Sequence, residues 1–281
     1  MGNLKTFLRR KTYLLPNYIV ICLLLVFALY PLVVMASNSL KSPSDAGSNL
    51  LGFPRKLIWE NYPNAWEAGD FVHTVPNSLI LVAGTTLGVM LFGGMAAYSI
   101  AKLKLPGADL LTLFLLISSS LPVQLFLVPL FFLWRHLGLV NNLFGLIIIY
   151  IAVQSPFSIF LLRSYMVQIP ADFEDAARVD GADELAVFMR VVVPLTWPAF
   201  LTVGLVVGLN VWNEFLLATV FLTDQKLYTV VTSYYNFSSM YFTDWGQISA
   251  SAIMMITPLM ILFLLLQRRF IEGLTQGGLK G

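Results

Sequence analysis

Residues 143–162 read LFGLIIIYIAVQSPFSIFLL and contain no Asp, Glu, Lys or Arg. The hydrocarbon core of a bilayer is about 30 Å thick, and a helix that rises ~1.5 Å per residue crosses it with about 20 apolar residues. Lipid offers the backbone no hydrogen-bond partners, so such a stretch must be helical. These residues therefore predict a transmembrane helix and place the chain among the integral membrane proteins.

Five further apolar stretches of similar length surround this one, and a single acidic residue, Glu214, interrupts them. The six predicted spans are residues 17–37, 77–101, 110–134, 143–162, 194–222 and 246–266. The sequence thus predicts an all-α integral membrane fold with six transmembrane helices. Residues 1–281 are expected to form a single transmembrane domain.

The composition excludes several classes of function. Of the 281 residues, 58% are hydrophobic and 11% are charged, whereas soluble domains carry about 25% charged residues. A soluble enzyme is therefore excluded, and a net charge of +2 is too small for a nucleic-acid-binding surface. With one cysteine and two histidines, the sequence predicts neither an internal disulfide nor a metal site.

The basic residues predict the orientation in the membrane. With six spans, both termini lie on one side, and that side receives 12 of the 17 Lys and Arg residues. Because loops rich in Lys and Arg stay in the cytoplasm, both termini are predicted to be cytoplasmic. The first span is expected to remain as an anchor, since its apolar run is longer than the 7–15 residues of a signal peptide.

The segment between the fourth and fifth spans, residues 163–193, is predicted to be cytoplasmic. It reads RSYMVQIPADFEDAARVDGADELAVFMRVVV. Asp172 is expected to cap a short helix that ends at Asp180-Gly181, and Leu185, Phe188 and Val192 are expected to share one face of a second helix. Small alanine-rich helices suit either a docking surface for a partner or a connector that lies on the membrane.

The spacing of residues within this segment resembles the EAA loop of ABC-importer permeases. Asp175-Ala176-Ala177 is followed by three residues, then Gly181, then nine residues, then Val191-Val192-Val193-Pro194. The family pattern has Glu at the first position, and here Asp175 replaces it with Glu174 beside it. In that family the loop forms a coupling helix that docks on a cytoplasmic ATPase. The resemblance therefore implies that the ATPase-coupling residues are Glu174, Asp175, Ala176, Ala177, Asp180 and Gly181.

Other motifs resemble the carbohydrate-uptake branch of these permeases, in particular the smaller, six-span subunit of maltose-type importers. They are Pro156-Phe157, Ile169-Pro170, Trp212-Asn213-Glu214-Phe215 and the tail Gly273-Leu274-Thr275 to Gly281. The resemblance implies a permease of a prokaryotic cytoplasmic (inner) membrane that forms half of the translocation pathway for a sugar, expected to be a di- or oligosaccharide.

The resemblance also implies the partners. They are a second permease subunit, expected to be a different chain, a cytoplasmic ATPase dimer and an extracellular or periplasmic solute-binding protein. This chain has no P-loop and is expected to bind no cofactor, to hold no catalytic residue and to leave ATP and Mg²⁺ to the ATPase.

Polar residues inside the spans are candidates for the substrate pathway, because intramembrane acids and amides face cavities or partners. For Glu214, a structural hydrogen bond to another span near the outer rim of the membrane is favoured over a role in the pathway. The candidates are Asn210, Trp212, Asn213, Glu214, Gln124 and Gln154.

Aromatic residues gather in the loop before the last span, which is predicted to face outward. Such clusters mark binding surfaces or membrane interfaces. The residues expected to contact the solute-binding protein are Tyr234, Tyr235, Phe237 and Tyr241, and residues 38–76 form a second candidate surface.

Small-residue pairs permit close approach of helices. Gly84 and Gly88 form one such pair and Gly204 and Gly208 another, and packing within this chain is favoured over a seam between subunits.

Other functions remain open at this stage. A permease for an amino acid or polyamine would share the same loop. An ion-coupled secondary transporter would need several intramembrane carboxylates, and the spans contain only Glu214.

Overall fold

The computed structural model describes the backbone of residues 2–103, 105–240 and 244–278, and the side chains within them from residue 16 onward, except residues 266 and 268–278. Every regular element within these ranges is a helix, and none of them is a strand. The contacts divide the chain into two compact units, which are described separately.

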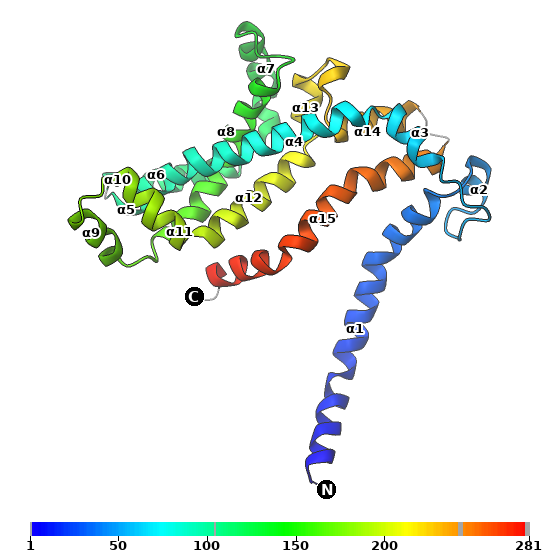
Figure 1. The fold of residues 1–281 in the computed structure, drawn as a ribbon, viewed down its shortest axis with the longest axis horizontal. Helices are drawn as coiled ribbons and strands as arrows, with labels where there is room; N and C mark the ends of the chain where they lie inside the picture. The colour runs from blue at the N-terminus through cyan, green and yellow to red at the C-terminus, as the bar shows by residue number, and fades with distance from the viewer. Residues whose placement is uncertain (1, 104, 241–243, 279–281) are drawn as a thin grey trace. The chain divides into compact units, whose positions relative to one another are not determined.

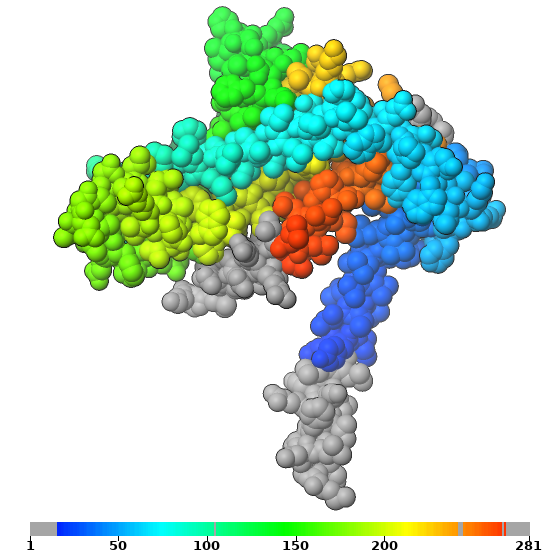
Figure 2. Space-filling model, viewed as in Figure 1, coloured from blue at the N-terminus to red at the C-terminus, as the bar shows by residue number. Residues whose placement is uncertain are grey.

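The first unit comprises residues 1–69 and 236–256. Helix α1 (Gly2–Asn38) is followed by the short helices α2 (Pro43–Ser48) and α3 (Asn61–Ala68), and the unit also contains the first part of α15 (Trp245–Gly278). Large apolar side chains along α1, from Tyr18 to Val33, are exposed (Figure 2). Exposed apolar residues over this length are what a lipid-facing helix requires.

The second unit comprises residues 70–235 and 257–281. Its long helices α4, α8 and α12 pack on one another, and α5 packs on α8 (Figure 1). Leu81, Leu146, Tyr150 and Val203 are among the buried residues of their common core. The α-helices of this unit are α4 (Phe71–Gly88), α5 (Gly94–Lys102), α6 (Ala108–Ser119), α7 (Leu127–His136), α8 (Leu143–Met166), α9 (Ala171–Val179), α10 (Glu184–Val187), α11 (Val193–Leu195), α12 (Trp197–Trp212) and α13 (Leu216–Phe221). Helix α14 (Val230–Met240) continues into the first unit, and α15 continues from the first unit into this one at residue 257.

The lengths of the helices give four to six candidate membrane spans. Four described helices are long and apolar enough to cross a bilayer without a break, and two bent pairs could each form one more. One pair joins α6 to residues 123–136 at 89°, and the other joins residues 184–195 to α12 at 82°. Proline explains the position of both bends, since Pro122 follows the end of α6 and Pro198 lies in the first turn of α12. Proline lacks the N–H that a continuing helix needs there.

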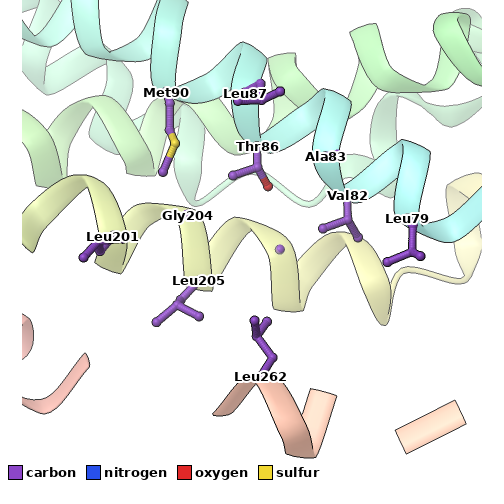
Figure 3. Close-up of a pocket in the computed structure, with 11 residues that line it drawn as sticks. Leu79, Val82, Ala83, Thr86, Leu87, Met90, Leu201, Gly204, Leu205 and Leu262 are labelled. Atoms are coloured by element: carbon purple, nitrogen blue, oxygen red, sulfur yellow. The ribbon is translucent and has the colours of Figure 1, made fainter. Parts of the chain in front are cut away.

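Glycine pairs bring the long helices of the second unit close together. A Cβ atom at Gly84 or Gly88 would collide with Ile147 or Ile151 of α8, and one at Gly204 would meet the end of Met90. An apolar groove of about 500 Å³ remains between α4 and α12, lined also by Leu262 (Figure 3). The structure thus shows both pairs packing within the chain, the favoured interpretation of the sequence.

Candidate functional site

The segment that links α8 to α12 contains the EAA-like residues, and α9 is its first helix. Pro170 occupies the N-cap position with extended backbone, and α9 begins at Ala171. Asp172, which was expected to be the cap, lies in the first turn together with Glu174. Both carboxylates there complement the positive end of the helix dipole, so the acidic start of the helix still stabilises it.

Gly181 ends α9, as the sequence predicts. Its φ of +88° lies in the left-handed region, and a Cβ added there would meet open space. The N–H of Ala182 donates to the carbonyl of Ala177 at 3.0 Å, and the N–H of Gly181 donates to that of Arg178 at 3.0 Å. These two bonds define a Schellman C-cap. Glycine is therefore required here by the backbone conformation and not by a close neighbour.

The second short helix, α10, begins where the side chain of Asp183 accepts a hydrogen bond from the N–H of Ala186 at 2.7 Å. The chain then continues as a π-helical turn over Phe188–Val192. Phe188 and Val192 are buried, but Leu185 is exposed, so the three residues do not share the expected face. The π-helical turn has a different period from the α-helical spacing used for that prediction.

A buried ion pair fixes α9 to the end of α5. The ammonium of Lys102 lies 2.8 Å from the Glu174 carboxylate, and Glu174 is only 2% exposed. Lys102 also donates to the carbonyl of Ile169 at 2.6 Å. Glu174 therefore points into the protein and holds α9 in place. Removing one partner of such a pair leaves an uncompensated buried charge.

A second, partly exposed network joins α9 to α10. Arg178 donates to Glu184 at 2.8 Å and to Asp175 at 2.9 Å. The hydroxyl of Tyr98, from α5, donates to the other oxygen of Glu184 at 2.6 Å. The hydrogen bond to Glu184 holds the pKa of Arg178 above its ordinary value. Tyr98 and Lys102 were not predicted as site residues, because nothing in one sequence pairs them with residues about 80 positions away.

The opposite side of α9 is exposed. Val179 is 88% exposed and Phe173 is also exposed, as are the acidic residues Asp172, Asp175 and Asp180 of the same segment. Of the six residues assigned to coupling, Asp175, Ala176, Asp180 and Gly181 are exposed. Ala177 instead packs against the hydrophobic core, as Glu174 does against Lys102. The exposed face, defined by Phe173, Asp175, Ala176, Val179 and Asp180, is termed the α9 face.

This segment offers an exposed contact surface and several charged side chains. Among the described residues, no three His, Cys, Asp or Glu side chains form a group that could hold a metal ion. The segment's buried ion pair and its hydrogen bonds to Tyr98 and Lys102 make it a fixed element attached to the end of α5. Such an element can transmit a displacement from a partner to the spans.

Glu214, the acid inside the fifth predicted span, lies where that span breaks between α12 and α13. Its carboxylate accepts hydrogen bonds from the N–H groups of Leu217 at 2.8 Å and Ala218 at 3.0 Å. The hydroxyl of Tyr150 donates to it at 2.7 Å. Glu214 thus satisfies the free N–H groups at the start of α13, which supports the structural interpretation.

The other candidate pathway residues are only partly brought together. The amide of Asn210 donates to the side-chain oxygen of Gln154 at 3.2 Å, which joins α12 to α8. Asn213 and Gln124 are exposed, and Asn213 donates to the carbonyl of Leu209. Trp212 is buried, so its ring has no face open for a sugar.

The aromatic candidates for a partner surface differ in exposure. Tyr235 is exposed and its ring centre lies 4.7 Å from that of Phe215. Tyr234 is half-buried, and its burial raises its pKa. Phe237 is buried within the protein, and Tyr241 lies outside the described residues.

Comparison with known families identifies one match. Residues 89–276 match the model of the family described as "Binding-protein-dependent transport system inner membrane component". That range includes α9, α10, Gly181 and Glu214.

Two curated relatives match nearly the whole chain. It is 34% identical to the trehalose transport system permease protein SugB of Mycobacterium tuberculosis, over 97% of this chain and 99% of the relative. It is 33% identical to the diacetylchitobiose uptake system permease protein NgcG of Streptomyces coelicolor, over 90% of this chain and 84% of the relative.

A solved structure shares the fold. It is a chain of a bacterial ABC transporter involved in the import of the acidic polysaccharide alginate. The TM-score is 0.79 at 24% identity, with 92% of this chain and 97% of that chain covered.

Proposed function

The chain belongs to the family of binding-protein-dependent transport system inner membrane components, and we propose that it carries a sugar across the membrane as a permease subunit of an ATP-driven importer. It is a multi-pass membrane protein, and its family consists of permease subunits. The two relatives named above are permeases for trehalose and diacetylchitobiose, which favours a di- or oligosaccharide over an amino acid or polyamine.

The main observation in support of this proposal is that the segment around α9 is held in a fixed position and leaves one face exposed. The Schellman cap at Gly181 and the Lys102–Glu174 pair give it a fixed position, and the α9 face remains exposed. We propose that this face docks on a cytoplasmic ATPase, which binds ATP and Mg²⁺. Movement of the ATPase would then reach α5 through the Lys102–Glu174 ion pair and the Tyr98–Glu184 hydrogen bond.

The proposed architecture is one permease domain with six spans and both termini in the cytoplasm. The four continuous helices, together with the two bent pairs if each is one span, would supply the six spans. The excess of Lys and Arg on one side supports the orientation. A second permease subunit would complete the pathway, and a solute-binding protein would deliver the sugar. The polar residues of α8 and α12, Gln154 and Asn210, are proposed to face that pathway.

Uptake by the reconstituted complex tests the function. Proteoliposomes would contain this chain, the partner permease and the ATPase, with the solute-binding protein outside and ATP inside. We expect accumulation of a radiolabelled di- or oligosaccharide that requires ATP and the binding protein, and no accumulation of a labelled polyamine or amino acid. Accumulation of the sugar by this chain alone, without nucleotide, would contradict the proposal.

A further inference from the structure

The loop between α2 and α3 exposes an unusual number of large apolar side chains. Phe53 is 81% exposed and Trp59 is 61% exposed, and Leu50, Leu51 and Leu57 are exposed as well. Residues 50–59 are termed the 50–59 loop. Clusters of this kind on a protein surface mark contact with a membrane or with another protein.

Hydrogen bonds place the 50–59 loop at the end of the first membrane helix. The hydroxyl of Ser37, in the last turn of α1, donates to the carbonyl of Gly52 at 2.8 Å. The N–H of Ile58 donates to the carbonyl of Leu40, two residues after α1, at 2.9 Å. The candidate span in α1 covers Pro16–Asn38, so both bonds lie at the C-terminal end of that span, next to α2 (Figure 1).

Lys41 fixes this position. Its side chain is fully buried, and its ammonium donates to the side-chain oxygen of Asn38 at 2.7 Å and to the carbonyls of Asn49 and Leu50. Burial lowers the pKa of Lys41, although nearby Asp45 opposes this shift. A buried ammonium with three oxygen partners holds the start of the 50–59 loop against the end of α1.

Basic residues accompany the apolar ones. Arg55 and Lys56 are exposed between Phe53 and Trp59, and the N–H of Arg55 donates to the buried Asp45 at 2.9 Å. Tryptophan with flanking Lys and Arg is the composition that proteins use at the lipid headgroup region.

We infer that the 50–59 loop is a lipid anchor, which inserts Phe53, Leu57 and Trp59 into the headgroup region at the C-terminal end of α1. The exposed Lys56 is then within reach of the lipid phosphates, and Arg55 lies beside it with its guanidinium 3.5 Å from the Asp45 carboxylate. This inference rests on the membrane location and does not depend on the transported substrate.

A site-directed fluorophore tests the depth of this loop. The only cysteine, Cys22, would be replaced by serine, and Phe53→Cys would carry an environment-sensitive label in the full-length chain. Gly47→Cys on α2 is the matched control, because Gly47 is exposed and a Cβ there meets nothing within 4 Å. Leu57→Cys provides a second reporter if the first label perturbs the loop. The protein would be placed in phosphatidylethanolamine–phosphatidylglycerol nanodiscs.

We expect the Phe53 label to emit at shorter wavelength, to lose intensity with lipids brominated high on the acyl chain, and to resist quenching by aqueous iodide. The Gly47 label should be quenched by iodide instead. Equal quenching by iodide at both positions would overturn the inference. Shielding of the Phe53 label that appears only after the solute-binding protein is added would also overturn it, and would make the loop a protein-docking surface.

Discussion

Gly181 is a single residue on whose backbone conformation the end of α9 depends. Its φ of +88° costs a residue with a Cβ atom roughly 1–2 kcal/mol. Because the added Cβ would meet open space, the penalty comes from the backbone alone.

We expect Gly181→Ala to reduce ATP-dependent transport while the protein still inserts, and Gly181→Asn to reduce it less, because Asn tolerates this conformation better. Transport assays at equal expression measure the difference. Equal transport by the two variants and the native chain would show that the cap has no role in coupling.

Glu214 is a second single residue whose role can be tested, because its hydrogen bonds are expected to stabilise the fold. Hydrogen bonds to a charged group are worth about 1.5–3 kcal/mol, and Glu214 accepts three of them. We expect Glu214→Gln and Tyr150→Phe each to lower the melting temperature of the purified protein and to leave the apparent substrate affinity unchanged. Asn213→Ala, at an exposed neighbouring position, serves as the control for the melting temperature. A change in affinity without a loss of stability would instead place Glu214 in the substrate pathway.

At the scale of elements, the buried Lys102–Glu174 pair determines where α9 lies on α5. Leaving one charge of such a pair unpaired costs about 3–5 kcal/mol, whereas apolar residues can replace both partners with little loss. We therefore expect Glu174→Gln to destabilise the protein and to uncouple ATP hydrolysis from transport. The double variant Lys102→Met/Glu174→Met should regain much of the stability.

The matched control for this prediction is Asp175→Asn, one residue along the same helix, where the carboxylate is exposed. It should leave the melting temperature unchanged. Thermal unfolding of the detergent-solubilised chain measures all four proteins. If Glu174→Gln and Asp175→Asn behave alike, the buried pair does not fix α9.

The sequence predicted the positions of the helices better than the bends and breaks inside them. The uncharged stretch at residues 143–162 lies inside one continuous helix, α8, because its length and apolarity leave the backbone no alternative. Residues 110–134 and 194–222 instead contain bends near Pro122 and Pro198, and α12 ends before Glu214. A proline permits either a kink or a break, and the neighbouring helices decide between them.

The candidate site could be predicted only where its features depend on residues that are close together in the sequence. Gly181 and the acidic start of α9 follow from residues next to one another in the chain. The contacts of Lys102 with Glu174 and of Tyr150 with Glu214 join distant parts of the sequence, so only the packing of helices reveals them. The same holds for Phe237, whose aromatic neighbours suggested exposure although its side chain is buried.

For the whole molecule, the energy for transport is proposed to come from outside, because this chain is expected to bind no nucleotide. We propose that a separate ATPase moves this permease at the α9 face. The face is small, and Val179 is its most exposed apolar residue. A contact made there would reach the spans through the Lys102–Glu174 ion pair, which joins α9 to α5.

Photo-crosslinking in native membranes tests this claim most directly. A benzophenone amino acid would replace Val179, and a control would replace Leu137, which is exposed beyond the opposite end of α8. We expect the Val179 probe to capture an ATP-hydrolysing subunit, identified by mass spectrometry, and the Leu137 probe not to capture it. Capture of no such subunit from Val179, or equal capture from both positions, would contradict it.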